Sequence, residues 1–285
     1  MYKTKLCLSL FSSFTFGMTE QLRLFKEAGF DGFFTHWNKE VKKCRELADE
    51  LGMIYQSLHA PFGKIEKIWG DDDAAADVTD ELIRCVDCCS EYDIPIAVVH
   101  PYKGFTKREL SIDSGLDNFR RVVDEAVKRN VVIAFENVEG EEYIAALMGA
   151  FANCENVGFC WDSGHELCYN GGKDMLALYG DRLVATHIND NFGISDFEGN
   201  IAFTDDLHLL PFDGVTDWRN AAKRLSQCKP LDTLTFELTR QSKPRRHDND
   251  KYMRMNAEEY VAECYARACK LAYMKQRATL DAKGV

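Results

Sequence analysis

The sequence predicts a single (β/α)8 barrel, or TIM barrel, that spans residues 1–285 as one domain. Short runs of β-branched and aromatic residues alternate with longer amphipathic runs eight times along the chain. Several of the short runs are continuously apolar, which is typical of parallel strands that are covered on both faces. A length of 285 residues suits one barrel, since this fold uses about 250 residues. A doubly wound open sheet is the alternative that this alternation leaves open.

The eight predicted strands occupy residues 5–11, 31–37, 54–62, 94–102, 131–137, 157–165, 183–190 and 233–239. The predicted helices occupy residues 18–29, 39–52, 71–93, 114–130, 141–153, 173–180, 217–228 and 256–276. We expect the first two helices to stop at Gly29 and Gly52, because glycine adopts the left-handed conformation that ends many helices. The region from Asn189 to Trp218 is predicted to be a long loop after the seventh strand, and such loops are usually functional.

Composition narrows the function classes. The net charge of −11 disfavours a surface built for nucleic acid. No apolar run approaches the roughly 20 residues that a membrane span needs, so neither nucleic acid nor a membrane is an expected partner. The N-terminal segment faintly resembles a signal peptide, but its Ser and Thr residues and the lack of a cleavage site favour a first strand.

The chain contains 11 cysteines with no regular spacing. The densest group, Cys85, Cys88 and Cys89, lies in a predicted helix without a second pair of Cys or His at zinc-site spacing. Reduced thiols in the core of a cytoplasmic protein are therefore the favoured interpretation.

Metal-ligand residue types gather where the predicted strands end. A lone His at a strand end is more often structural than a ligand. Carboxylates such as Glu136 and Glu237, which follow apolar strands, are rare unless paired or bound to a cation. Because the carboxyl ends of barrel strands meet at one face, we expect a shared site there. The candidates are His59, His100, Glu136, Asp162, His165, His187, Asp206, His208 and Glu237.

The mixture of Glu, Asp and His suits a divalent cation such as Mn²⁺, Zn²⁺, Co²⁺ or Mg²⁺. The absence of Cys from these positions disfavours a structural zinc site. Cys160 is expected to share the face of Asp162 one step deeper in the strand.

These residues resemble those of the xylose-isomerase-like TIM-barrel superfamily. The resemblance covers nearly the whole chain and is carried by "SLHAPF", "VVHP", "FEN", "WDSGH", "HINDN", "DLHLLPFDG" and "FEL". That superfamily contains sugar isomerases and epimerases, inosose dehydratases and the endonuclease-four type of AP endonuclease. The resemblance to the epimerases implies one metal held by Glu136, Asp162, His187 and Glu237. It also implies that the two Glu residues act as the acid–base pair, that His165 contacts a substrate oxygen, and that the protein forms a homodimer.

The resemblance to the endonucleases implies three zinc ions, whose extra ligands match His59, His100, His165, Asp206 and His208. The sequence thus retains residues for both patterns, and the ligands alone do not choose between them. The acidic chain and the weakly basic loops after the first three strands favour an isomerase or epimerase that acts on a small carbohydrate. A lyase of the inosose-dehydratase kind and an AP endonuclease are the alternatives.

Three residues are further candidates for substrate binding. Trp69 and Phe11 are expected near the mouth of the barrel, where they would cover the apolar face of a sugar. The alternative for Trp69 is that it packs a loop. The stretch "TRQSKPRRHDND" after the eighth strand supplies Arg240, Lys243, Arg245 and Arg246. Barrels often bind phosphate near the last two strands, and Arg240 is the candidate nearest the strand. A solvated charged loop is the alternative interpretation of this stretch.

Overall fold

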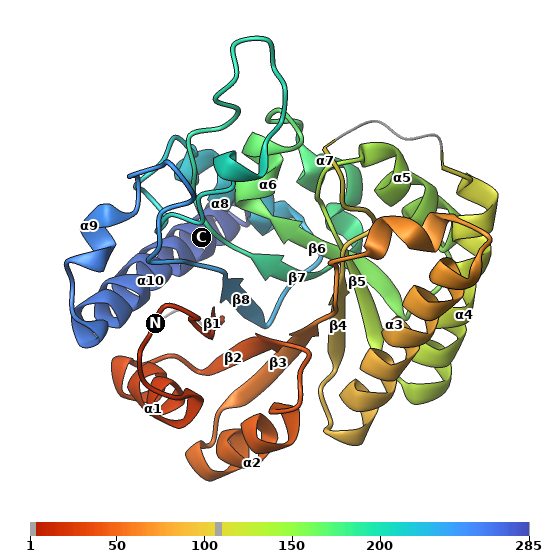
Figure 1. Ribbon diagram of the computed structural model, residues 1–285. Helices are drawn as coiled ribbons and strands as arrows, with labels where there is room; N and C mark the ends of the chain where they lie inside the picture. Colours follow the sequence, from red (N-terminus) through yellow and green to blue (C-terminus); the bar gives the residue numbers. More distant parts are fainter. Residues whose placement is uncertain (1–3, 106–109, 285) are drawn as a thin grey trace.

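The computed structural model describes residues 4–105 and 110–284 of the chain. Its eight strands lie at the centre and the helices surround them (Figure 1). All neighbouring strands in the sheet are parallel, in the order β7-β6-β5-β4-β3-β2-β1-β8. The strands are β1 (Lys5–Ser9), β2 (Gly32–His36), β3 (Ile54–His59), β4 (Ile96–Val99), β5 (Val132–Glu136), β6 (Val157–Asp162), β7 (Leu183–His187) and β8 (Thr233–Phe236).

The two ends of this strand order, β7 and β8, meet and nearly close the barrel. The backbone amide of Ile188 donates to the carbonyl of Thr235 at 2.9 Å. The amide of Glu237 donates in turn to the carbonyl of Ile188 at 3.2 Å. The hydroxyl of Thr186 bonds to the backbone of Thr235 in both directions. The predicted (β/α)8 barrel is therefore confirmed, and the open-sheet alternative is wrong.

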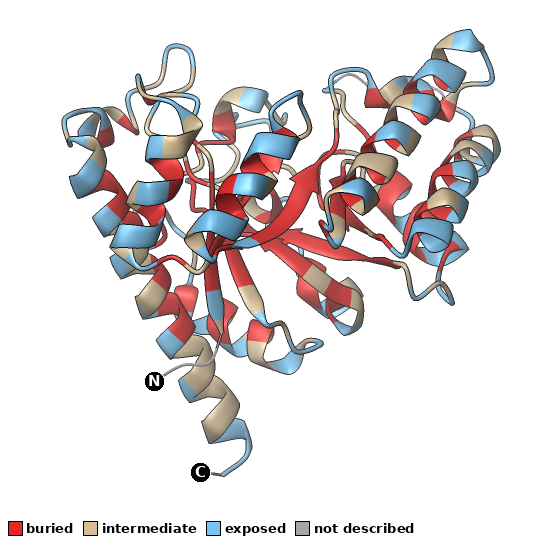
Figure 2. Ribbon diagram, turned by 90° about the horizontal axis from the view of Figure 1, so that it is seen from below, coloured by how far each residue is buried: buried red, intermediate tan, exposed pale blue. Residues whose placement is uncertain are grey.

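The helices follow the strands in sequence and cover them from outside. Figure 2 shows buried strands within helices whose outer faces are exposed. The α-helices are α1 (Met18–Ala28), α2 (Val41–Leu51), α3 (Asp73–Glu91), α4 (Ile112–Arg129), α5 (Glu141–Ala150), α6 (Ser163–Cys168), α7 (Met175–Tyr179), α8 (Trp218–Gln227), α9 (Asp250–Met253) and α10 (Ala257–Ala282). Short 3-10 turns are η1 (Ile65–Trp69), η2 (Gly180–Arg182) and η3 (Phe203–Asp205). Within the described residues, no helix is long and apolar enough to cross a bilayer.

Helix ends follow local chemistry. Gly29 and Gly52 end α1 and α2 with φ values of 110° and 59°, as the sequence predicts. The predicted strand over 157–165 is too long, because β6 stops at Asp162. The carboxylate of Asp162 accepts the backbone N–H of His165 at 2.7 Å and so caps α6. His165 thus lies on a helix rather than on a strand.

Small side chains fill part of the barrel interior beneath its mouth. Val98, Ala134, Cys160 and Ala185 form one buried cluster from β4 to β7. Alternate residues of a strand share a face. The residues two positions further along these strands therefore project above the cluster, and they include Glu136, Asp162 and His187. The same alternation places Cys160 below Asp162, as predicted.

Trp69 anchors η1 against α4 and the loop after β4, and it does not line the cavity described below. Its side chain is fully buried and its indole N–H donates to the carbonyl of Pro101 at 2.8 Å. The ring packs against Tyr143, with centroids 4.6 Å apart, and lies directly over Gly115 of α4. A Cβ atom at position 115 would stand 2.0 Å from the Trp69 ring, so only glycine fits this contact.

We expect Gly115→Ala to lower the free energy of unfolding by about 1 to 3 kcal/mol, because the added methyl group forces the packed indole to move. Gly149→Ala is the matched control, since a Cβ atom at Gly149 in α5 meets open space. That change is expected to be neutral or to stabilise by up to about 1 kcal/mol through helix propensity. Urea unfolding of the two variants tests this, and equal effects would contradict the contact.

Candidate metal centre

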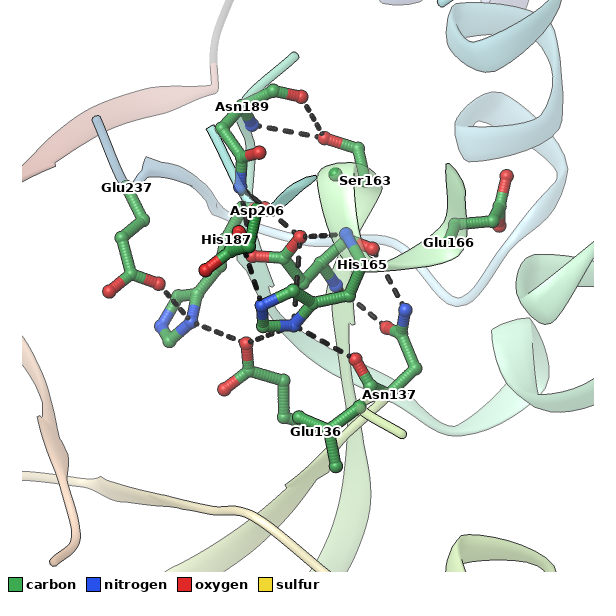
Figure 3. Close-up of polar contacts among 12 residues, drawn as sticks. Glu136, Asn137, Ser163, His165, Glu166, His187, Asn189, Asp206 and Glu237 are labelled. Atoms are coloured by element: carbon green, nitrogen blue, oxygen red, sulfur yellow. Dashed lines mark hydrogen bonds and ion pairs between the residues drawn. The ribbon is translucent and has the colours of Figure 1, made fainter. Parts of the chain in front are cut away.

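Four side chains converge at the carboxyl ends of the last four strands. Glu136 and Asp162 end β5 and β6, His187 ends β7, and Glu237 follows β8. One ligand atom from each of them lies within 4.8 Å of the ligand atoms of the other three. The Nδ1 atom of His187 stands 3.2 Å from Glu136 Oε1 and 2.9 Å from Glu237 Oε2 (Figure 3). This inner group contains the residues that the resemblance to the epimerases implies.

The two oxygens of Glu136 face different sets of imidazoles. Oε2 lies 3.4 Å from His59 Nε2 and 3.3 Å from His100 Nε2. Oε1 lies 3.3 Å from His165 Nδ1, in addition to its contact with His187. His59, Glu136 and His187 form a second group with ligand spacing. Glu136 is thus placed to be shared between two cation positions.

The loop after β7 brings two more predicted residues to the site. Asp206 Oδ1 lies 2.8 Å from His208 Nε2 and 3.5 Å from His165 Nε2. Asp162, His165 and His208 form a third group with ligand spacing. All nine candidates from the strand ends and from this loop therefore lie in one continuous cluster.

The chemistry of the donor atoms fits a divalent cation. Both oxygens of Glu136, both ring nitrogens of His187 and Oδ1 of Asp206 are buried without a well-aligned hydrogen bond. Buried polar atoms of this kind are rare unless an ion or water satisfies them. Mixed carboxylate and imidazole donors suit Mn²⁺, Zn²⁺, Co²⁺ or Mg²⁺.

Mutual attraction keeps Glu136, His187 and Glu237 charged. Burial by itself raises the pKa of Glu136, but the imidazoles of His187 and His100 outweigh burial and hold the pKa well below its ordinary range. Burial likewise lowers the pKa of His187, but the carboxylates of Glu136 and Glu237 outweigh it and raise that pKa well above its ordinary value. A proton on His187 thus offsets the charge of the two glutamates, and a metal ion can replace it. Burial instead lowers the pKa of His100 to about 4, which favours its neutral form.

Two asparagines orient Asp162. The side-chain amide of Asn189 donates to both carboxylate oxygens of Asp162, at 3.1 and 2.9 Å. Asn137 accepts the backbone N–H of Asp162 at 2.8 Å and donates to its carbonyl at 2.9 Å. The sequence-based prediction misses both asparagines. Their position one or two residues after a ligand, in "FEN" and "HIND", is the signal that could have found them.

A cavity of about 230 Å³ opens above the cluster. His59, His100, His165, Asp206, His208 and Glu237 of the predicted set line it. His36, Phe62, Lys103, Phe105, Glu139, Tyr169 and Lys243 complete the lining. Of these, only Lys243 is a residue that the sequence singles out. His36 ends β2, and its ring lies 4.9 Å from that of His59, so its place at a strand end was the available signal.

The three residues predicted to contact substrate do not line this cavity. Trp69 is buried under α4, as described above. Phe11 is buried against Phe14, Phe25 and Tyr260. Arg240 donates to the carbonyls of Tyr252 and Met255, and its guanidinium covers the rings of Phe14 and Tyr260. These contacts pack the structure, and the proposals below assign no substrate contact to the three residues.

Asp190 fixes the loop that carries Asp206 and His208. Its fully buried carboxylate accepts hydrogen bonds from the backbone N–H groups of Asn191, Phe212 and Thr216, the Thr216 hydroxyl and the Trp218 indole. Its backbone also pairs with Leu209 in both directions. His208 lies between these anchors with a φ of 48°, a conformation that few non-glycine residues adopt.

We expect Asp190→Asn to lower the free energy of unfolding by about 1 to 3 kcal/mol. Both carboxylate oxygens of Asp190 accept hydrogen bonds, and the amide nitrogen of asparagine cannot replace one of them. Asp196→Asn, on the exposed outer part of the same loop, is the control and should change stability by less than about 0.5 kcal/mol. Chemical unfolding measures both variants. A smaller effect at Asp190 than at Asp196 would contradict the anchoring role.

Metal removal provides a second test of this site. An ion present at about a thousand times its Kd stabilises the folded state by about 4 kcal/mol. Chelation should therefore lower Tm by roughly 10 °C, and Mn²⁺, Zn²⁺, Co²⁺ or Mg²⁺ should restore it.

Glu136→Gln should abolish most of the increase in Tm that added metal produces. The substitution removes a carboxylate that belongs to two of the three groups with ligand spacing. Glu139→Gln is the matched control, since Glu139 is buried and lines the cavity but belongs to none of the three groups. Elemental analysis of the dialysed proteins gives the metal content. Equal content in the two variants would contradict the assignment.

The chain is similar to proteins of known structure. A xylose isomerase-like TIM barrel and 4-hydroxyphenylpyruvate dioxygenase fusion protein superposes with a TM-score of 0.75 at 17% identity, over 99% of this chain and 44% of that one. This chain therefore spans less than half of that fusion protein. The IOLI protein with a bound zinc atom superposes with a TM-score of 0.74 at 18% identity, over 94% of this chain and 98% of that one.

A D-psicose 3-epimerase from Clostridium cellulolyticum H10, solved with D-tagatose, gives a TM-score of 0.73 at 12% identity, over 95% of this chain and 99% of that one. In sequence, the uncharacterized protein y4fM of Sinorhizobium fredii is 29% identical over an alignment 302 residues long. The alignment covers 90% of this chain and 89% of that protein. The family model described as xylose isomerase-like TIM barrel matches residues 22–258. The chain therefore belongs to the xylose isomerase-like TIM barrel family.

Proposed function

We propose that this protein is a metal-dependent isomerase or epimerase that acts on a sugar or sugar phosphate. The observation that carries the proposal is the group of Glu136, Asp162, His187 and Glu237 beneath a cavity of about 230 Å³. At about 30 Å³ for each water, this cavity has room for roughly eight waters, which suits a single sugar unit. Similarity to sugar epimerases supports the same substrate class.

The inner group would hold the divalent ion through the two glutamates, Asp162 and His187. When bound, the ion would act as a Lewis acid that polarises a substrate carbonyl and its neighbouring hydroxyl. The asparagine contacts described above would keep Asp162 in the orientation that the ion requires.

The two glutamates would move the proton. Glu237 lines the cavity and its side chain is 14% exposed, so its carboxylate can reach the carbon next to the carbonyl. Glu136 is fully buried beyond His187 and would return a proton from the opposite side. His165 also lines the cavity and would donate a hydrogen bond to a substrate oxygen.

A multinuclear phosphodiesterase that cleaves DNA at abasic sites is the second candidate. The observation that favours it is the pair of additional groups around His59 and His208, which offer further cation positions. Clustered ions of this kind clamp a phosphate and activate water. The net charge of −11 opposes it, because binding DNA requires neutralisation of several phosphates.

Proton exchange from deuterated water into ketoses, aldoses and inososes tests the proposal whichever product the enzyme forms. We expect metal-loaded protein to wash deuterium into at least one of these sugars. Glu237→Gln keeps an oxygen donor but cannot take a proton, so exchange should fall by about 10² to 10⁴-fold. NMR follows the exchange, and metal content is measured in parallel to separate loss of the base from loss of the ion.

The control for that experiment is Glu139→Gln, which leaves the proposed acid–base pair intact. An abasic-site duplex is assayed beside the sugars. Cleavage of the duplex with no exchange into any sugar would overturn the isomerase proposal in favour of the second candidate.

A further inference from the structure

We propose that the substrate carries an anionic group, a phosphate monoester or a carboxylate, which Lys103 and Lys243 recognise at the rim of the cavity. This inference rests on the proposed function and names the substrate class of the same site. It begins from two cationic side chains that come from distant loops, after β4 and after β8, and line one small cavity.

The ammonium group of Lys103 lies over an aromatic ring rather than beside an acid. It stands 4.8 Å above the centroid of the Phe62 ring, which itself stacks on His100 at 4.5 Å. Across residues 4–105 and 110–284, no carboxylate lies within ion-pair distance of this ammonium. A cation in this setting at a cavity wall is available to a negatively charged ligand.

The ammonium group of Lys243 can donate more hydrogen bonds than the one it makes to Asp206. Its Nζ atom lies 3.1 Å from Asp206 Oδ2, and its side chain is 25% exposed. An ammonium group has three N–H donors, so one contact with Asp206 leaves capacity toward the cavity. The same contact holds the lysine in place beside the metal-ligand residues.

The carboxylates that line the cavity do not cancel these two charges once metal is bound. Glu237 belongs to the inner group, where a bound ion would neutralise it, and Asp206 already faces His208 at 2.8 Å and His165 at 3.5 Å. Glu139 is directed elsewhere, since its Oε1 atom accepts the backbone N–H of Gly104 at 2.8 Å. Burial also raises the pKa of Glu139, which favours its neutral form.

The depth of the site sets where the anionic group lies on the sugar. Glu136, Asp162 and His187 are fully buried at the base, whereas the two lysines are partly exposed. For proton transfer, the carbonyl end of the substrate must reach the bottom of the cavity, where these residues lie. The far end of a short sugar then falls at the rim, so the anionic group belongs on the terminal carbon remote from the carbonyl.

Two of the three arginines in the basic stretch after β8 are engaged elsewhere, and the third, Arg245, does not line the cavity. Arg246 pairs with Asp205 at 3.0 Å and Asp248 at 2.8 Å, and Arg240 packs on Phe14 and Tyr260. Neither lines the cavity. The basic stretch therefore contributes one residue to this recognition, Lys243, and the second, Lys103, comes from the loop after β4, whose sequence "YKGFTKRE" is also basic.

Matched pairs of ligands test the inference. Metal-loaded protein is assayed with D-ribulose and D-ribulose 5-phosphate, with D-fructose and D-fructose 6-phosphate, and with D-fructuronate for the carboxylate. We expect kcat/KM to be about tenfold or more higher for the charged member of a pair, the size of one charged hydrogen bond. The phosphates and the uronate distinguish the two kinds of anion.

Lys103→Met should lower kcat/KM for the charged substrate about tenfold more than kcat/KM for the neutral one. Lys243→Met should also lower kcat/KM for the charged substrate more than for the neutral one. Because Lys243 contacts Asp206, the metal content of this variant is measured as well. Lys64→Met is the control, since Lys64 is exposed and does not line the cavity. Equal loss for charged and neutral sugars in Lys103→Met, or a preference for neutral sugars in the unaltered protein, would overturn the inference.

Calorimetric titration separates this inference from the proposed function. D-Ribulose 5-phosphate and D-ribulose are titrated into metal-loaded protein and into Lys103→Met. Tighter binding of the phosphate that depends on Lys103, without turnover of any sugar, would support anion recognition and overturn the isomerase proposal. Turnover with no difference between charged and neutral sugars would support the isomerase proposal and overturn anion recognition.

Discussion

The burial of the Glu136 carboxylate is the constraint on which the site depends. A charged carboxylate that is removed from water is strongly destabilised unless partners compensate for the lost hydration. Four imidazoles stand 3.2 to 3.4 Å from its oxygens, and they come from β3, from the ends of β4 and β7, and from α6. These elements must therefore hold their positions together, because displacement of any one of them would leave part of the charge uncompensated.

The surrounding structure maintains this arrangement through groups that never touch the ion position. Asn189 and Asn137 set the orientation of Asp162, and Asp190 anchors the loop that carries His208. The loops after β7 and β8 are also joined by ion pairs of Asp205 with Arg246 and of Asp206 with Lys243. The strands thus carry the inner group of residues, and a network of buried polar contacts holds the loop with Asp206 and His208 in place.

The sequence predicts well the barrel and the meeting of these His, Asp and Glu side chains, because both follow from rules of the backbone. Parallel strands end at one face, so residues such as Glu136 and Glu237 meet wherever the exact strand bounds lie. It predicts the cavity wall poorly. Trp69 and Phe11 pack into the core, and Lys103 enters the cavity, because the direction of a loop side chain depends on its neighbours in the folded state. The apolar pattern places His165 in a strand, because it does not reveal that Asp162 caps α6 and ends the strand there.

The contact between β7 and β8 has a consequence for how the protein matures. Glu237 follows β8, and its backbone N–H bonds to Ile188 where the barrel closes. The inner ligands are spread from Glu136 to Glu237, so a growing chain lacks the complete site until β8 has left the ribosome and docked beside β7. On the proposed function, metal acquisition would then be a late event in biosynthesis, and an ion held by all four inner residues would link β8 to β5, β6 and β7.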